Sequence, residues 1–425
     1  MFMHENVKRF VVTLPNIMDQ RMGYLSSYFD NVIDRMPMLT HLELLCGQAM
    51  EPERLSMLCM DEIEDDVLEL IRGLPNLHVV LLSPGITSRL VEGLSHLPNL
   101  AEIDCRPDPE VCYDIANYVE FEPSLVEGAF PSLNYLAHFA VFAQTTLFLK
   151  TPFFPSNLTV LQIESPWVEC PSDLHMLSVA IAENCQLLTA LYLLISCDRD
   201  AFEETGSIGD IYERITLDSF RPLLSCPNIK TFEIVHQDSF DLQLEDIEEI
   251  ASKWPSLETL KLNNDPVIFP AHESPFAYQS LPTLRSLLPF ARHCPRLQHL
   301  GLFLRASMTD IPAAHELQSF QRLECLSMGV SYLAEEGPVT HFLSQICPVG
   351  CRVESSDKLE GEVGELLRRR WKTVDEWLPL LMRSRMEERR RMREENTERV
   401  RALEAELAAF RLGLFGHGNS NIAMQ

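Results

Sequence analysis

One pattern of apolar and polar positions recurs along most of the chain. In "WPSLETLKLN" (residues 254–263), Leu260 and Leu262 alternate with Thr259 and Lys261 behind a Trp-Pro pair. Alternation with a period of two is typical of a strand that buries one face and exposes the other. The copies occupy residues 5–12 (the weakest), 36–45, 74–82, 97–104, 130–139, 155–164, 185–194, 226–235, 254–263, 294–303 and 320–329. Each copy predicts one short strand.

Helical spacing precedes most of these strands. Apolar residues at steps of three and four fill residues 65–73, 88–96, 174–184, 244–253 and 284–293. A proline just ahead of most strands stops the helix before it, because proline lacks the backbone donor that a helix needs. Cys185, Cys226, Cys294 and Cys347 occupy the equivalent helix-end position, where a small apolar thiol can pack under the next turn. Each unit is therefore predicted to be helix, tight turn and short strand.

Stacked units of this kind predict an α/β solenoid over residues 1–355. The strands would form a curved parallel sheet on the concave side, and the helices would cover the convex side. The repeated "L-x-x-L-x-L" resembles the leucine-rich repeat, and the irregular units with "CP-x-L" turns look most like the repeat region of fungal F-box proteins. The Asn that normally ends the motif stands at Asn263 and is absent from most copies.

The outward strand residues would line the concave surface and are the predicted partner-binding residues. On the strands they are His41, Glu43, Glu102, Asp104, Tyr135, Gln162, Tyr192, Glu233, Thr259, Lys261, His299 and Phe303. Tyr135, Tyr192 and Phe303 are the expected anchors, because aromatic side chains supply much contact area at low entropic cost. The alternative is that these side chains only shield the sheet.

Three insertions follow strands, at residues 107–130, 197–218 and 263–282, and are expected to project from one rim of the solenoid. Phe276 and Tyr278 in the third insertion are further predicted contacts for a partner. They could equally tuck that loop back onto the body.

The repeats stop near residue 355, and a helical composition follows. Residues 356–382 are predicted to cap the last repeat with an apolar face that includes Trp371, Val374, Trp377 and Leu381. Residues 383–414 read as a charged helix. Its Val400, Leu403, Leu407 and Phe410 have the spacing of a short coiled coil, although two heptads also fit a solvated helix. Residues 415–425 are expected to be a disordered tail.

Charge and composition limit the kinds of partner and the compartment that we expect. Of the formal net charge of −27, residues 1–364 carry −30 (22 Lys and Arg against 52 Asp and Glu) and residues 365–425 carry +3 (13 against 10). Such an acidic body makes nucleic acid an unlikely partner. No apolar window long enough for a membrane span occurs, and no secretory signal is evident. With the twelve cysteines expected to be reduced, the sequence predicts a cytoplasmic or nuclear protein.

Motifs for chemistry are missing from the sequence. Phosphate loops, dinucleotide fingerprints and the common hydrolase and zinc-protease signatures do not occur. Cys347 and Cys351 in "CPVGC" lack a second Cys/His pair at zinc-finger spacing. We therefore expect no enzyme, no cofactor and no metal.

The expected function is protein binding on the concave face. Resemblance to F-box proteins implies a substrate-recognition role in ubiquitin ligation, with components of a cullin-RING ligase as further partners if an F-box exists upstream. Residues 14–29 start with Leu-Pro but lack the usual acidic residue of an F-box. An F-box is therefore expected to be lost or to lie before Met1. The alternative function is a stand-alone scaffold whose C-terminal helix associates with itself or with a partner.

Overall fold

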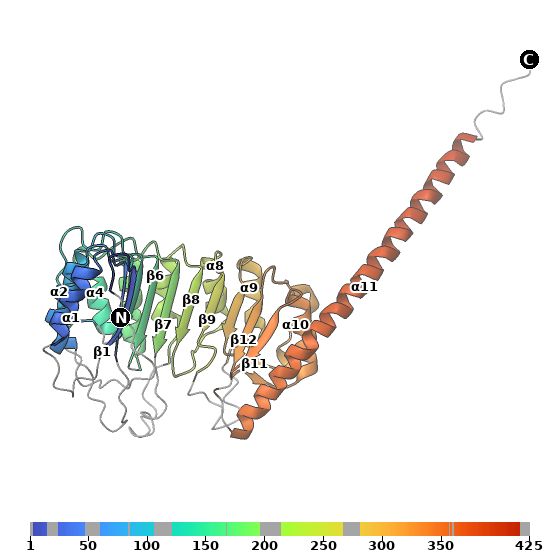
Figure 1. Cartoon of the computed structure of the whole chain (residues 1–425). Coiled ribbons are helices and arrows are strands. Elements are labelled where there is room, and N and C mark those ends of the chain that lie inside the picture. Colours follow the sequence, from blue (N-terminus) through green and yellow to red (C-terminus); the bar gives the residue numbers. More distant parts are fainter. Residues whose placement is uncertain are drawn as a thin grey trace, which may run out of the picture.

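The protein is an α/β solenoid whose sheet runs along the whole length of the body. The computed structural model describes residues 3–14, 24–46, 60–83, 86–105, 121–166, 168–195, 214–266, 281–356, 358 and 361–416. Twelve parallel strands follow one another in chain order with no strand out of sequence, apart from a small second sheet near the C-terminal end (Figure 1). The predicted solenoid is confirmed.

The bounds of the elements are as follows. The long sheet contains β1 (Arg9–Leu14), β2 (His41–Cys46), β3 (Val79–Leu82), β4 (Glu102–Cys105), β5 (Tyr135–Phe139), β6 (Val160–Ser165), β7 (Ala190–Ile195), β8 (Thr231–Val235), β9 (Thr259–Leu262), β10 (His299–Leu302), β12 (Cys325–Gly329) and β14 (Arg352–Ser355). The small sheet pairs β11 (Arg305–Ala306) with β13 (Tyr332–Leu333). The α-helices are α1 (Leu25–Arg35), α2 (Met60–Gly73), α3 (Ser88–Ser95), α4 (Phe142–Leu149), α5 (Pro171–Asn184), α7 (Leu217–Phe220), α8 (Leu244–Lys253), α9 (Leu287–His293), α10 (Glu336–Ile346) and α11 (Gly361–Gly416), and the 3-10 turns are η4 (Arg221–Ser225), η7 (Leu284–Ser286), η8 (Met308–Asp310) and η9 (Ala314–Glu316).

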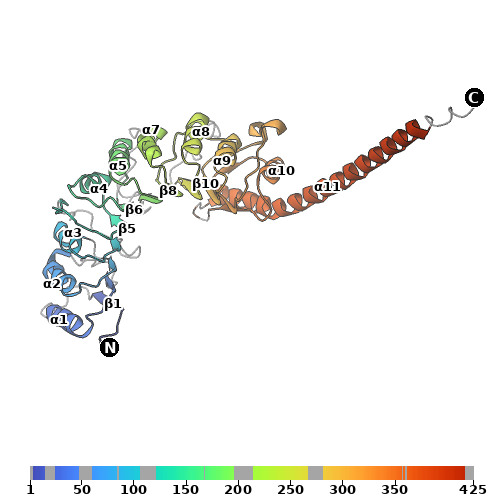
Figure 2. The same cartoon turned by 90° about the horizontal axis from the view of Figure 1, so that it is seen from above.

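The body curves, with the sheet on its inner side and helices α1 to α10 along its outer side (Figure 2). The core lies between the two layers. It contains the leading apolar residue of ten of the eleven repeats, all almost fully buried: Leu39, Leu77, Leu100, Leu133, Leu158, Leu188, Ile229, Leu257, Leu297 and Leu323. Each repeat thus buries the face that its neighbour leaves open, as the sequence pattern predicts.

Backbone hydrogen bonds join the repeats just before each strand. The carbonyl of Thr40 accepts from both His78 N (2.8 Å) and Val79 N (3.0 Å), and the carbonyl of His78 accepts from the next repeat in the same way. The arrangement recurs along the body up to the carbonyl of Gln298, which accepts from Glu324 and Cys325. These turns therefore pair their backbone polar groups even though unit lengths differ widely.

The helix-end cysteines are packing residues. Cys185, Cys226 and Cys294 are buried, and the Cys294 thiol donates to the backbone carbonyl of Ala251 (3.5 Å). Burial raises the pKa of Cys185 and Cys294 to about 12 and that of Cys226 to about 11. These thiols therefore stay protonated at neutral pH and are poor nucleophiles.

The long helix α11 covers the open end of the sheet. Trp371 is buried, and its indole Nε1 donates to the carbonyl of Ser331 (2.8 Å). The carboxylate of Asp375 accepts from Val353 N of the last strand (2.8 Å), which satisfies a donor at the sheet edge. Two details differ from the sequence prediction. The buried stripe runs through Leu378 instead of Trp377, which is exposed, and α11 continues unbroken past residue 382.

Candidate partner-binding face

The inner face of the sheet carries a compact polar group at its centre. In the strand register Tyr192 of β7 lies beside Glu233 of β8, and Glu233 lies beside Lys261 of β9. Lys261 Nζ lies 3.1 Å from one Glu233 carboxylate oxygen and 3.2 Å from the other. All three side chains are half-buried, while the residues between them along each strand face the core. We call Tyr192, Glu233 and Lys261 the central patch.

The central patch has a defined protonation state at Tyr192. Partial burial and then the Glu233 carboxylate raise the pKa of the Tyr192 phenol, and the Lys261 ammonium acts in the opposite sense. The phenol thus keeps its proton and can donate a hydrogen bond to a partner. Because Lys261 neutralises Glu233, the patch offers a donor and a near-neutral pair instead of a concentrated charge.

Two rows of smaller and apolar side chains flank the central patch. On one side lie Ala190, Thr231 and Thr259, in register across the three strands. On the other side lie Leu194 and Val235, paired in register and half-exposed. An aromatic residue and a paired charge between an apolar row and a row of small residues match the composition of protein interfaces, which mix apolar contact with a few polar groups.

The N-terminal strands continue the inner face with acidic residues. Glu43 is paired with Arg9 of β1, with Arg9 Nε donating to the carboxylate at 2.7 Å. Glu102 is exposed, Asp104 is half-exposed, and register places Tyr135 beside Glu102. Sequence reasoning missed Arg9, although its position one strand before His41 and Glu43 follows from the first repeat.

The remaining predicted positions differ in their access to solvent. His41 is half-buried, and its Nδ1 hydrogen-bonds the hydroxyl of Thr40 at 2.8 Å. Thr259 and His299 are also half-buried and lie side by side in register. Phe276 and Tyr278 lie outside the described residues.

Two predicted partner-binding residues are buried, and the prediction was wrong for them. Gln162 lies in register between Ala137 and Tyr192, and neighbouring side chains leave only 8% of it exposed. Phe303 follows the end of β10 and is 6% exposed, because it packs in a small apolar cluster with Leu281, Val330 and Tyr332. Phe303 therefore cannot anchor a partner on this face.

Directly after β9, Asn264 and Asp265 cross part of the inner face, and most of the rim loop predicted at residues 263–282 lies outside the described residues. A Cβ at Gly301 would meet the side chain of Asn264 at 3.2 Å, and one at Gly329 would overlap the Asn264 carbonyl oxygen. Asn264 Nδ2 donates to Ser327 Oγ of β12 at 2.9 Å. Asp265 accepts from Ser356 Oγ at 2.7 Å. Among the described residues, the inner face thus stays open from β1 to β9, and Asn264 covers part of it beyond.

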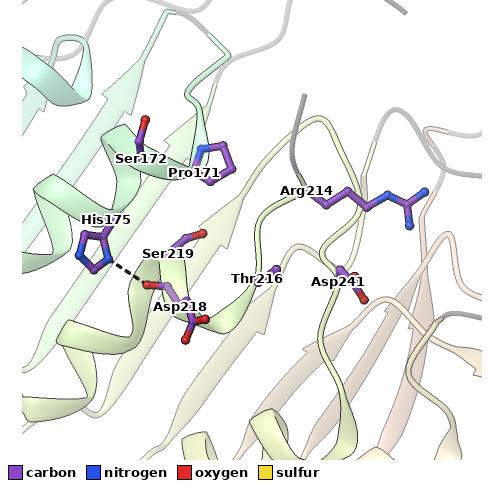
Figure 3. A pocket seen from close by; sticks show the side chains of 8 residues that line it. All are labelled: Pro171, Ser172, His175, Arg214, Thr216, Asp218, Ser219 and Asp241. Carbon is purple, nitrogen blue, oxygen red and sulfur yellow. Dashed lines mark hydrogen bonds between the residues drawn. The ribbon is translucent and has the colours of Figure 1, made fainter. Parts of the chain in front are cut away.

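An open depression of about 560 Å³ lies between the start of α5 and the loops around α7 (Figure 3). It is lined by Pro171, Ser172, His175, Arg214, Thr216, Asp218, Ser219 and Asp241. His175 Nδ1 bonds the backbone carbonyl of Asp218 (2.9 Å), while the Asp218 carboxylate accepts from Arg221 Nε (2.9 Å). The Asp218 carboxylate therefore pairs with Arg221, while His175 bonds only the backbone of Asp218 among the described residues.

The described part of the chain contains neither a metal-ion cluster nor a membrane-spanning helix. No group of three or more His, Cys, Asp or Glu residues is placed to hold a metal ion. No helix within the described ranges has the length and apolarity needed to cross a membrane. Cys347 and Cys351 are both buried.

The fold and its inner face define an α/β solenoid with an open sheet surface. No protein-family model matches the chain, and no curated protein matches it significantly. The class of protein therefore rests on the repeat pattern and the architecture.

Proposed function

We propose that this protein is a non-enzymatic binding module that holds a protein partner on the inner face of its sheet, around the central patch. The observation that carries the proposal is the side-by-side placement of Tyr192, Glu233 and Lys261 in mid-sheet, on the face opposite the described helices α1 to α10 (Figure 2). Core positions of the same strands are filled by apolar residues. Tyrosine is one of the residue types enriched in interface hot spots, so Tyr192 is the expected anchor of the patch.

We further propose that the partner is a protein selected for ubiquitination. Support comes from the resemblance of the repeats to leucine-rich repeats of F-box proteins. The residue that ends the best-formed repeat, Asn263, is buried, and its side chain bonds the backbone of the preceding repeat at His236 N (3.0 Å) and the Asp238 carbonyl (2.7 Å). Components of a cullin-RING ligase are the further partners that this role requires.

The test compares two charge reversals of the same kind on opposite faces of the full chain. Lys261→Glu places a second acid beside Glu233 on the inner face, whereas Lys253→Glu changes an exposed residue at the end of α8 on the outer face. Proteins that co-purify with the wild-type chain from its own cells are identified and quantified for both variants and for Tyr192→Ala.

We expect Lys261→Glu and Tyr192→Ala to reduce capture of the same partner at least tenfold, and Lys253→Glu to leave it unchanged. Equal capture by all variants would reject the inner face as the binding surface. For the ubiquitination role, recovery of a cullin scaffold with the chain and accumulation of the partner when the chain is deleted are required. Partner capture that depends on the patch but occurs without any ligase subunit would favour the alternative function, a stand-alone scaffold.

A specific observation favours keeping that alternative. Beyond Arg385, whose guanidinium bonds His341 of α10, α11 leaves the body and projects as an isolated helix in both views (Figures 1 and 2). An isolated binding module for one partner would not need this extension, because the cap over the last repeat is complete before it begins.

A further inference from the structure

We propose that the projecting half of α11 pairs with the same helix of a second copy of this chain, in antiparallel orientation. The proposal deepens the scaffold alternative and does not depend on the inner face. It starts from what changes along α11. Up to Met382 the apolar stripe of the helix is buried against α10 and β14, at Leu367, Trp371, Val374, Leu378 and Met382.

Beyond Met382 the same helix keeps an apolar stripe but loses its cover. Val400, Leu403, Leu407 and Phe410 are 53%, 57%, 52% and 68% exposed. They step by three, four and three residues and so lie on one face of the helix. Helices in water are stabilised mainly by packing of such a face, and this stretch packs against nothing within its own described chain.

The stripe can be followed back towards the body at heptad spacing. Asn396, Arg393, Arg389 and Met386 precede Val400 at steps of four, three, four and three. Among them Met386 is exposed to 54%. The exposed face therefore spans 25 residues from Met386 to Phe410, a length of about 37 Å at 1.5 Å per residue. It begins with Met386, is polar from Arg389 to Asn396, and is apolar from Val400 to Phe410.

Charge along this stretch is divided into two blocks of opposite sign. Residues 383–393 carry six Arg and two Glu, while residues 394–410 carry five Glu and two Arg. A parallel pair would place the basic block of one helix against the basic block of the other. An antiparallel pair places each basic block against an acidic block, twice by symmetry. The charge division therefore selects both a second copy as the occupant and the antiparallel orientation.

The spacing fixes the register of such a pair. If Met386 packs on Phe410 of the second copy, Arg393 lies against Leu403 and Asn396 against Val400 of that copy, with the two-fold axis near Glu398. The aliphatic stem of each arginine then covers a leucine while its guanidinium reaches the acidic block. Arg390 comes beside Glu404 of the second copy. Within its own helix, Arg390 reaches only Glu394, at 3.5 Å and highly exposed.

The first experiment measures the mass of the full chain in solution by light scattering at tens of micromolar and low salt. We expect twice the chain mass of 48.5 kDa for the wild type. The double variant Leu403→Lys/Leu407→Lys should have the mass of one chain, whereas the control Glu395→Lys/Arg399→Glu, which keeps the net charge, should stay dimeric. A monomeric wild type at these concentrations, or a dimer that survives the two lysines, would overturn the proposal.

The second experiment tests orientation. Full chains with Met386→Cys and with Phe410→Cys are mixed and oxidised with oxidised glutathione, and the wild-type chain measures the background from native cysteines. We expect a disulfide between the two different variants. Efficient disulfide formation by Met386→Cys with itself would indicate a parallel pair and refute the antiparallel register. Charge exchange adds a check: Arg390→Glu and Glu404→Arg should each weaken the dimer several-fold, and the double variant should restore it.

The dimer and the inner face can fail separately. Tyr192→Ala and Lys261→Glu are expected to leave the mass unchanged. Leu403→Lys/Leu407→Lys is expected to retain binding of the partner at a single site. A variant that loses both dimerisation and partner binding is checked for folding of the body by far-ultraviolet circular dichroism, which has to match that of the wild type.

Discussion

Replacement of Asn263 by alanine is predicted to destabilise the middle of the solenoid. Asn263 is 1% exposed and lies at φ 43°, in the left-handed region. Its side-chain oxygen accepts from His236 N at 3.0 Å, and its side-chain nitrogen donates to the Asp238 carbonyl at 2.7 Å. Alanine would leave a buried N–H group and a carbonyl without these partners.

The size of the effect follows from two separate contributions. An unsatisfied buried backbone group costs about 1–3 kcal/mol, which applies to the buried His236 N–H group, and the part-buried Asp238 carbonyl adds about 1 kcal/mol. Alanine in the left-handed region adds about 1 kcal/mol, which glycine avoids. We therefore expect Asn263→Ala to lower the free energy of unfolding by about 3–5 kcal/mol, and Asn263→Gly to lower it by about 1 kcal/mol less.

The assay has to report locally, because repeats of a solenoid can open separately. Native-state hydrogen exchange measures the opening free energy of the backbone amides around His236, and urea unfolding followed by circular dichroism gives the global midpoint. The matched control is Asn184→Ala, which removes a single hydrogen bond to the Ala180 carbonyl (2.9 Å) at a half-exposed helix end. Losses at His236 of less than about 1 kcal/mol in both Asn263 variants would refute the reasoning, since the two bonds would then contribute little.

Three further predictions test the core. Burial lowers the pKa of His138 to about 4 from the unfolded value of 6.5. The free energy of unfolding should therefore be unaffected by this histidine above pH 6.5 and should fall by about 3 kcal/mol as the pH drops to 4, because the unfolded chain binds the proton more tightly. In urea midpoints measured against pH, His138→Phe should remove this fall. Gly329→Ala should lower the free energy of unfolding in urea by about 2–4 kcal/mol, because its Cβ would overlap the Asn264 carbonyl oxygen. The control Gly301→Ala should lower it clearly less. Equal effects would argue against the position of Asn264 over the inner face. Cys185 and Cys294 should resist alkylation in the native protein at pH 7.5 and react in urea, as mapped by mass spectrometry; rapid native labelling would contradict their burial.

The repeat pattern predicted the sheet well because each strand pairs with the strand of the next repeat along the chain. Leu257, Leu260 and Leu262 are buried, and Lys261 is on the open face, as alternation requires. Strand β14 was missed because "RVES" (residues 352–355) is too short and polar to stand out in the sequence. It forms because β12 offers it a free edge and Asp375 of α11 pairs with its backbone.

The candidate site was predicted less well, because accessibility depends on segments distant in sequence. Alternation placed Phe303 on the open face, but the return of the chain at Leu281 buries it. No sequence pattern signals that Asn264 crosses to Ser327, although the glycines at 301 and 329 are the one trace of it, since a side chain at either position would meet Asn264.

The two proposed surfaces have a joint consequence for how the protein would work. In the antiparallel register, the last buried residues of α11 in the two copies, both Met382, are separated by about 48 Å, which corresponds to 32 residues at 1.5 Å each. The two inner faces would then be held apart on a two-fold axis. A partner with two copies of its epitope, or a partner that is itself dimeric, would bind both faces at once and gain from a high effective concentration. A monomeric partner would gain nothing. The helix α11 would thus favour partners that carry two copies of the epitope, while Tyr192, Glu233 and Lys261 would determine which epitope is bound.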